Sequence, residues 1–203
     1  MREIDCALIT QSVEKLCIQA CCVQTDDIKV AFKKAQSTET SPLGQSILGK
    51  LVENGKIAEQ TLVPICQDTG LAVIFVEIGQ DVRIVGGYIE DAINEGVKNG
   101  YVNGYLRKSA VAEPLFERKN TTDNTPAVIH TRIVKGDKLK IKMAAKGFGS
   151  ENKSILKMLV PADGIEGVKK VFTEAVNLAG PNSCPPMVIG VGIGGTMEKA
   201  ALL

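Results

Sequence analysis

Tryptophan is absent from this sequence of 203 residues, and aromatic side chains make up only 4% of it. Few stacking platforms for single-stranded nucleic acid are therefore available. The charges nearly cancel, because 24 Lys and Arg stand against 23 Asp and Glu, for a net charge of +1. Broad electrostatic binding of nucleic acid needs a basic face. We therefore expect no nucleic-acid partner.

Long apolar runs are also missing, since none reaches the ~18 residues of a membrane span. The first five residues include Arg2, Glu3 and Asp5, which argues against a signal peptide. These features predict a cytoplasmic protein without a membrane partner. In a reducing compartment the six cysteines are not expected to form disulfides. They could be small buried hydrophobes, metal or cluster ligands, or a nucleophile.

Hydrophobic periodicity predicts an α+β fold. Helical spacing covers 5–23, 26–35 and 42–55, so residues 1–60 form a helical layer. The rest predicts a mixed β-sheet covered by helices, all in a single domain over 1–203. Strands are expected at 71–78, at 127–134 and 138–145 as a hairpin around the turn 135–137, and at 187–191. Helices are expected at 87–105, at 163–179 and from Thr196 onward.

Two loops carry most of the chemistry. The first, PICQDTG at 64–70, displays the thiol of Cys66, the amide of Gln67, the carboxylate of Asp68 and a hydroxyl together, although an incidental buried cysteine is the alternative. The second, NSCPP at 182–186, holds Cys184 on backbone stiffened by two prolines. That loop suits a cluster ligand and equally suits a structural turn.

Two glycine-rich segments have an anion-binding and a structural interpretation each. KGFGSEN at 146–152 predicts a carboxylate or phosphate site, a turn capped by Ser150, or both together. GVGIGG at 190–195 matches the dinucleotide pattern G-x-G-x-x-G, but the chain ends before the acidic residue expected about 20 positions later. A close-packed turn is favoured there, and a nucleotide-binding module remains the alternative. His130 is interpreted as a structural strand residue, and Cys17 and Cys21 as packing residues.

Four motifs in a fixed order make the sequence resemble a known family. PICQDTG at 64–70, YLR at 105–107, KGFGSEN at 146–152 and the run from NSCPP to GVGIGGT at 182–196 form this set. The chain resembles the alpha, or N-terminal, part of the iron–sulfur hydro-lyases, which are class I fumarases and L(+)-tartrate dehydratases. The likeness runs from the first helix to the last residue.

The resemblance implies a [4Fe–4S] cluster held by three cysteines, with one iron open to substrate. Cys66 and Cys184 match the first two ligands, and the third is expected beyond the end of this chain. Gln67, Asp68, Arg107, Gly147 and Gly149 match substrate-contacting positions. Asp68 is the candidate for proton transfer.

The family also implies a small dicarboxylate substrate, a separate beta subunit and an oligomer. Fumarate and malate are the first expectation, which would place the enzyme in the tricarboxylic acid cycle, and tartrate is the alternative. The chain ends at an uncapped apolar segment, AALL at 200–203, which predicts a fragment or a subunit whose remainder is missing. The resemblance then implies a truncated alpha subunit that is inactive alone, because it has two ligands for a three-ligand cluster. A fragment that only folds and binds its beta partner is the competing interpretation.

Overall fold

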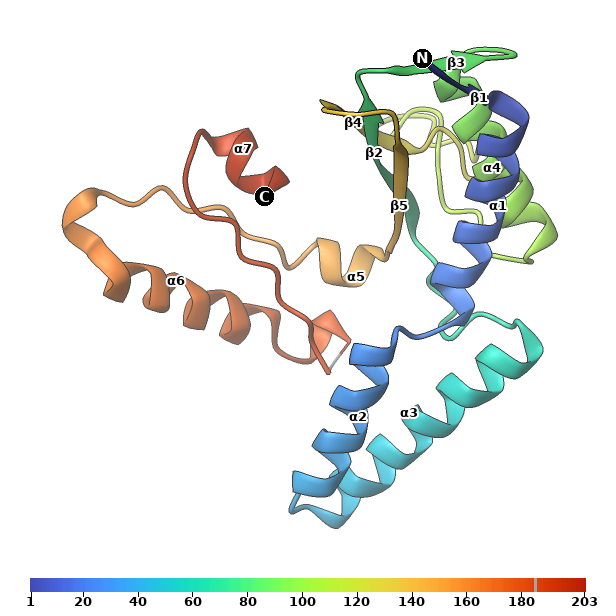
Figure 1. Ribbon diagram of the computed structural model, residues 1–203. Helices are drawn as coiled ribbons and strands as arrows, with labels where there is room; N and C mark the ends of the chain where they lie inside the picture. Colours follow the sequence, from blue (N-terminus) through green and yellow to red (C-terminus); the bar gives the residue numbers. More distant parts are fainter. Residues whose placement is uncertain (185) are drawn as a thin grey trace. The chain divides into compact units, whose positions relative to one another are not determined.

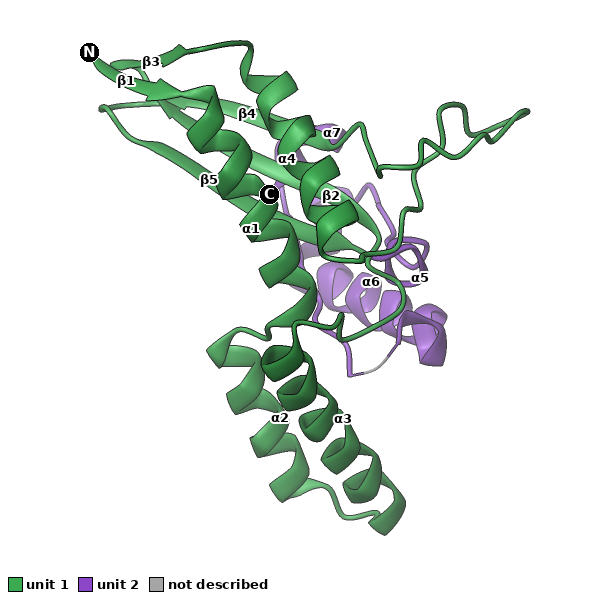
Figure 2. Ribbon diagram, turned by 90° about the vertical axis from the view of Figure 1, so that its right-hand side faces the viewer, with its two compact units in different colours: residues 1–146 green, residues 147–203 purple. Residues whose placement is uncertain are grey.

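The computed structural model describes residues 1–184 and 186–203, so Pro185 of the 182–186 loop lies outside the described residues. The chain divides into two compact units, Met1–Lys146 and Gly147–Leu203 (Figure 2). Each unit is described by itself. The single domain expected over residues 1–203 stays a prediction.

Three helices open the first unit, as predicted. They are α1 (Cys6–Cys22), α2 (Asp26–Thr38) and α3 (Pro42–Thr61). Asp5 caps α1 by accepting a hydrogen bond from the backbone N–H of Ala7 at 2.7 Å. α2 and α3 form a hairpin that extends away from the sheet (Figure 1), and α2 has no buried residue. A short strand that the sequence analysis missed, β1 (Arg2–Asp5), precedes α1 and pairs in parallel with β3 (Val82–Val85).

The main sheet has three strands, and its order corrects one prediction. β4 (Val128–Val134) and β5 (Leu139–Lys146) lie where strands were expected, but they are not a hairpin. β2 (Leu71–Gly79) lies between them, parallel to β4 and antiparallel to β5. The 135–138 connection crosses the end of β2, where Gly79 N–H donates to the carbonyl of Lys138 at 2.8 Å. A Cβ at Gly79 would collide with the carbonyl of Gly136.

The physical reason for this order is the burial of β2. Its Ala72, Ile74 and Val76 are at most 1% exposed, so the strand needs backbone partners on both sides as well as cover on one face. β5 keeps the predicted alternation, with Lys140 and Lys142 exposed and the intervening apolar residues packed on the core.

α1 and α4 (Ile89–Asn103) cover this face of the sheet (Figure 1). They approach closely because α4 presents glycines to α1. A Cβ at Gly96 would lie 2.6 Å from the carbonyl oxygen of Thr10, and one at Gly100 would lie 2.6 Å from Cβ of Cys17. Val13, Cys17 and Cys22 on α1 are fully buried in the resulting core.

One helical stretch, Cys6–Thr38, is by length and composition apolar enough to cross a membrane. Its apolar half is α1, whose side chains fill the core just described. Core helices of soluble proteins and signal sequences have the same length and composition, so this stretch is weak evidence for a membrane span. The cytoplasmic location and the absence of a membrane partner stay predictions.

The second unit contains α5 (Phe148–Glu151), η1 (Pro161–Asp163), α6 (Gly164–Ala179), η2 (Gly180–Ser183) and α7 (Met197–Leu202). The strand predicted at 187–191 was wrong, because residues 186–196 form neither helix nor strand. Val188 is 82% exposed and Val191 57%. The described part of this unit offers no strand as a pairing partner, and an apolar run without one leaves its backbone groups unpaired.

Candidate active site

Cys66 lies in the loop between α3 and β2. Both backbone polar groups of the preceding residue, Ile65, form hydrogen bonds. The N–H of Ile65 donates to the carbonyl of Cys21 at the end of α1, at 2.9 Å. Its carbonyl accepts a hydrogen bond from Nδ2 of Asn54 on α3, at 2.8 Å. Cys66 itself is exposed. The two helices therefore present this thiol to solvent on a fixed stretch of backbone.

The same loop turns sharply after Cys66. Oδ1 of Asp68 accepts a hydrogen bond from the N–H of Gly70 at 3.2 Å, which closes an Asx turn. Gly70 has φ +58°, a left-handed conformation that glycine adopts without a Cβ clash. The turn explains why the acidic residue and the glycine are two positions apart, and it places the Asp68 carboxylate at the start of β2.

Arg107 reaches this loop from the segment after α4. Its Nη1 donates to Oε1 of Gln67 at 3.0 Å. An open pocket of about 490 Å³ surrounds the pair, and its wall includes Cys66, Gln67, Thr69, Tyr105 and Arg107. Tyr105 is 91% exposed and has φ +52°. Three of the predicted site residues thus share one pocket, whereas Asp68 is next to Gln67 in the chain but is not part of the wall.

The other predicted site residues lie in the second unit and are close to each other. Gly147 is the N-cap of α5, so the alternative that Ser150 caps this turn was wrong; Oγ of Ser150 bonds back to the carbonyl of Gly147 at 3.2 Å. A Cβ at Gly149 would lie 3.9 Å from Sγ of Cys184, an ordinary contact distance. Cys184 is exposed, with φ +59°. The glycine segment and the second cysteine loop are therefore neighbours.

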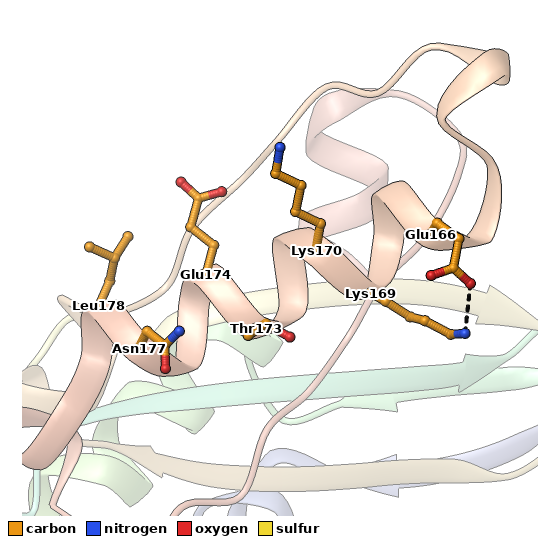
Figure 3. Close-up of a pocket in the computed structure, with 7 residues that line it drawn as sticks. All are labelled: Glu166, Lys169, Lys170, Thr173, Glu174, Asn177 and Leu178. Atoms are coloured by element: carbon orange, nitrogen blue, oxygen red, sulfur yellow. Dashed lines mark hydrogen bonds and ion pairs between the residues drawn. The ribbon is translucent and has the colours of Figure 1, made fainter.

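A second hollow runs along α6, but it is not a site. Figure 3 shows that its lining residues all come from this one helix, with Lys169 and Glu166 paired at 2.8 Å. A single helix cannot enclose a ligand, because a binding pocket needs walls on several sides.

Comparison with known proteins decides the family. Residues 10–203 match the family described as fumarate hydratase (Fumerase). The chain belongs to this family. A protein of Methanocaldococcus jannaschii provisionally named L(+)-tartrate dehydratase subunit alpha is 39% identical over 96% of this chain and 70% of its own length. The L(+)-tartrate dehydratase subunit alpha of Escherichia coli K12 is 32% identical over 88% of this chain. The chain spans 59% of the length of that relative.

The resemblance to fumarases and tartrate dehydratases is thereby confirmed. The position of Cys66 relative to Cys184 stays a prediction, because the two thiols belong to separately described units. Within residues 1–184 and 186–203, no group of three or more His, Cys, Asp and Glu side chains could hold a metal ion. The cluster and its third ligand beyond this chain stay predictions.

The cysteines separate into two chemical classes, and this division fits an iron–sulfur cluster. Cys6, Cys17, Cys21 and Cys22 are buried, whereas Cys66 and Cys184 are exposed. Burial raises the pKa of Cys17 and of Cys21 to about 12. Both thiols therefore stay protonated at neutral pH inside the packed core. The prediction that Cys17 and Cys21 are packing residues is confirmed, and the two exposed thiols are the ones suited to ligation.

Two buried polar residues beside the pocket, Tyr101 and Asn124, were not predicted from the sequence, and both are 0% exposed. Tyr101 lies within the helix predicted at 87–105, and no motif in the sequence indicates a role for its hydroxyl. Asn124 lies in a polar stretch, TTDNTP at 121–126, that reads as an ordinary loop. His130, by contrast, is a strand residue as expected, and its ring stacks on that of Phe75 with centroids 5.2 Å apart.

Proposed function

We propose that this chain is the alpha component of a hydro-lyase that adds water to, or removes it from, a four-carbon dicarboxylate. Membership in the family and the names of the relatives support the reaction class. The observation that carries the proposal is the pocket in which Arg107, oriented by Gln67, lies beside the exposed Cys66. A guanidinium with four N–H donors left over suits a carboxylate.

The substrate is a hydroxy-dicarboxylate with malate and L(+)-tartrate as the two candidates. Malate follows from the class I fumarases, which the motifs resemble. Tartrate is favoured by the names of the relatives in M. jannaschii and E. coli. Both molecules offer a carboxylate for Arg107 and a hydroxyl that must leave, so Arg107 does not by itself distinguish them.

Dehydration breaks a C–H bond next to one carboxylate and a C–O bond at the neighbouring carbon. Arg107 would hold a substrate carboxylate and stabilise the charge that develops on it as the proton leaves. Gln67 fixes the direction of the guanidinium. Asp68 would accept the proton, and a carboxylate can do so when its site tunes its basicity. The backbone at Gly147 and Gly149, next to Cys184, would supply further contacts to the substrate.

Cys66 and Cys184 would contribute two of the three thiolates of a [4Fe–4S] cluster. When bound, such a cluster supplies a Lewis-acidic iron for the hydroxyl and carboxylate of the substrate. The third thiolate would come from the part of the relatives that this chain does not span. A separate beta subunit would complete the pocket, because the relatives are named as alpha subunits.

The deciding experiment is anaerobic reconstitution of the alpha protein with its beta subunit, followed by assays on malate and on L(+)-tartrate. Turnover of either substrate supports the proposed hydro-lyase reaction, and the ratio of the two kcat/KM values identifies the preferred substrate. This 203-residue chain with the same beta subunit is the matched comparison. If the chain binds the beta subunit while the longer protein incorporates iron yet dehydrates neither acid, the proposal is wrong.

A further inference from the structure

Two segments far apart in sequence form the pocket, and Thr69 joins them. Thr69 follows Asp68 in the Cys66 loop and is 5% exposed. Its Oγ1 accepts a hydrogen bond from the backbone N–H of Arg107 at 3.0 Å and donates to the carbonyl of Arg107 at 3.3 Å. One hydroxyl therefore holds both backbone groups of the residue that carries the guanidinium.

Asn124 makes a second connection between the same segments. Its Nδ2 donates to the carbonyl of Gly70 at 3.1 Å. Its Oδ1 accepts from the N–H groups of Ser109 at 2.7 Å and Ala110 at 3.0 Å. This side chain is 0% exposed. An amide has an acceptor and a donor at opposite ends, so Asn124 can bridge the two segments, whereas a carboxylate would only accept.

Tyr101, on α4, contacts the same loop. Its hydroxyl lies 3.1 Å from the carbonyl of Thr69 and 3.3 Å from that of Gly70. Burial raises the pKa of Tyr101 well above its usual value, so the hydroxyl remains a donor. The carbonyls of Thr69 and Gly70, which follow Asp68, are thus held by Tyr101 and Asn124. Leaving any of these buried groups without its partner costs more than the net worth of one hydrogen bond, because water cannot replace it.

We propose that Thr69 and Asn124 are positioning residues that hold Arg107 at a fixed distance from Cys66 and Gln67. Neither side chain is assigned a contact with substrate. The proposal deepens the function proposed above and relies on it only for the identity of the bound acid. It requires that loss of the Thr69 hydroxyl move the guanidinium relative to the thiol, and not only destabilise the fold.

The position of the Arg107 guanidinium relative to the Cys66 thiol can be measured without enzymatic turnover. Iodoacetate and iodoacetamide alkylate a thiolate by the same displacement of iodide, but only iodoacetate is an anion. A guanidinium near Cys66 therefore raises the ratio of the two rates at that residue, which peptide mass spectrometry resolves from the other cysteines. Arg107→Gln should lower the ratio by about two- to fourfold, the size of one charge–charge interaction in a solvated site.

We expect Thr69→Val, which keeps the side-chain shape, to lower the ratio toward that of Arg107→Gln. Thr69→Ser should retain the wild-type ratio, because it restores the hydroxyl. The matched control is Thr10→Val, which removes a half-buried hydroxyl that bonds the carbonyl of Ala92 at 2.9 Å, between α1 and α4. This control should lower Tm and leave the ratio unchanged. Thr69→Ala replaces the valine variant if the latter does not fold.

Two results would overturn the proposal. One is a wild-type ratio in folded Thr69→Val or Thr69→Ala, which would make the hydroxyl purely structural. The other is an unchanged ratio in Arg107→Gln, which would place the guanidinium out of reach of Cys66. A separate arm adds malate or L(+)-tartrate and follows protection of Cys66. Absence of protection in the wild type counts against the proposed function and leaves the ratio comparison intact.

Discussion

Nη1 of Arg107 lies 3.0 Å from Oε1 of Gln67, although 40 positions separate the two residues. The hydrogen bond uses one donor of the guanidinium and sets its plane. Because the remaining donors keep their fork geometry, the pair is prepared for a carboxylate before any ligand arrives. This preparation gives the first prediction.

Arg107→Lys should raise KM for the dicarboxylate in the assembled protein by about ten- to a hundredfold, because an ammonium cannot make the paired hydrogen bonds of a guanidinium. Steady-state kinetics on malate and tartrate provide the measurement. The control is Arg83→Lys, at an exposed strand residue whose guanidinium lies 3.4 Å from Glu3. An unchanged KM in Arg107→Lys would remove this residue from substrate binding.

Cys66→Ser and Cys184→Ser should each lower the iron content of the reconstituted protein, because a serine hydroxyl is a poor replacement for a cluster thiolate. Iron and acid-labile sulfide are measured per chain, together with the absorbance of the cluster. Cys17→Ala is the control, since that thiol is buried in the core and should not bind iron. Full iron content in Cys66→Ser would show that the cluster ligands were assigned wrongly.

Gly96→Ala should reduce the free energy of unfolding by about 1–3 kcal/mol through overpacking. The added Cβ would lie 2.6 Å from the carbonyl oxygen of Thr10 and 2.7 Å from Cβ of Val13, so the two helices must move apart. Gly49→Ala on α3 is the helical control, because only the flexible end of Gln36 lies nearby, at 3.3 Å. It should be neutral or gain up to about 1 kcal/mol from helix propensity. Urea unfolding of both variants measures these changes. Equal losses of unfolding free energy in the two variants would refute the close packing of α1 on α4.

Stability should fall with rising pH above about 9. Burial raises the pKa of Cys17 and Cys21 from 9.0 to about 12. The folded chain thus keeps these two protons at pH values where the unfolded chain has lost them. Unfolding then releases protons, so the contribution is fully present below pH 9 and is lost as pH rises from 9 to 12.

The measurement is urea unfolding at several pH values between 8 and about 10.5, compared with the Cys17→Ala/Cys21→Ala variant. The variant should be less stable throughout, because it leaves cavities in the core, but its stability should decline less steeply with pH. Equal slopes would mean that these thiols titrate alike in the folded and unfolded chains.

Local patterns were sufficient for most elements. The apolar spacing of residues 5–23 and the β-branched run at 71–78 predicted α1 and β2, because each pattern reflects a side chain period that the element itself imposes. Strand partners were not predictable in this way. The 127–145 segment has the pattern of a hairpin, yet β2 lies between its arms. The run at 187–191 has the pattern of a strand, but without a partner it forms neither strand nor helix.

The candidate site shows the same difference between local patterns and long-range contacts. The motif at 64–70 placed Cys66, Gln67 and Asp68 on one loop, and the resemblance added Arg107, because short motifs preserve the residue types that a reaction needs. Nothing in the sequence indicated that Thr69 would bond both backbone groups of Arg107.

The sequence by itself therefore determined the α+β class, the family and the residue types of the site. The tertiary structure alone decided the order of the strands and how two loops are held together by Thr69, Tyr101 and Asn124. These features depend on contacts between residues tens of positions apart. Such contacts leave no periodic mark on the chain, since a buried hydroxyl or amide is satisfied by whichever backbone the fold brings beside it.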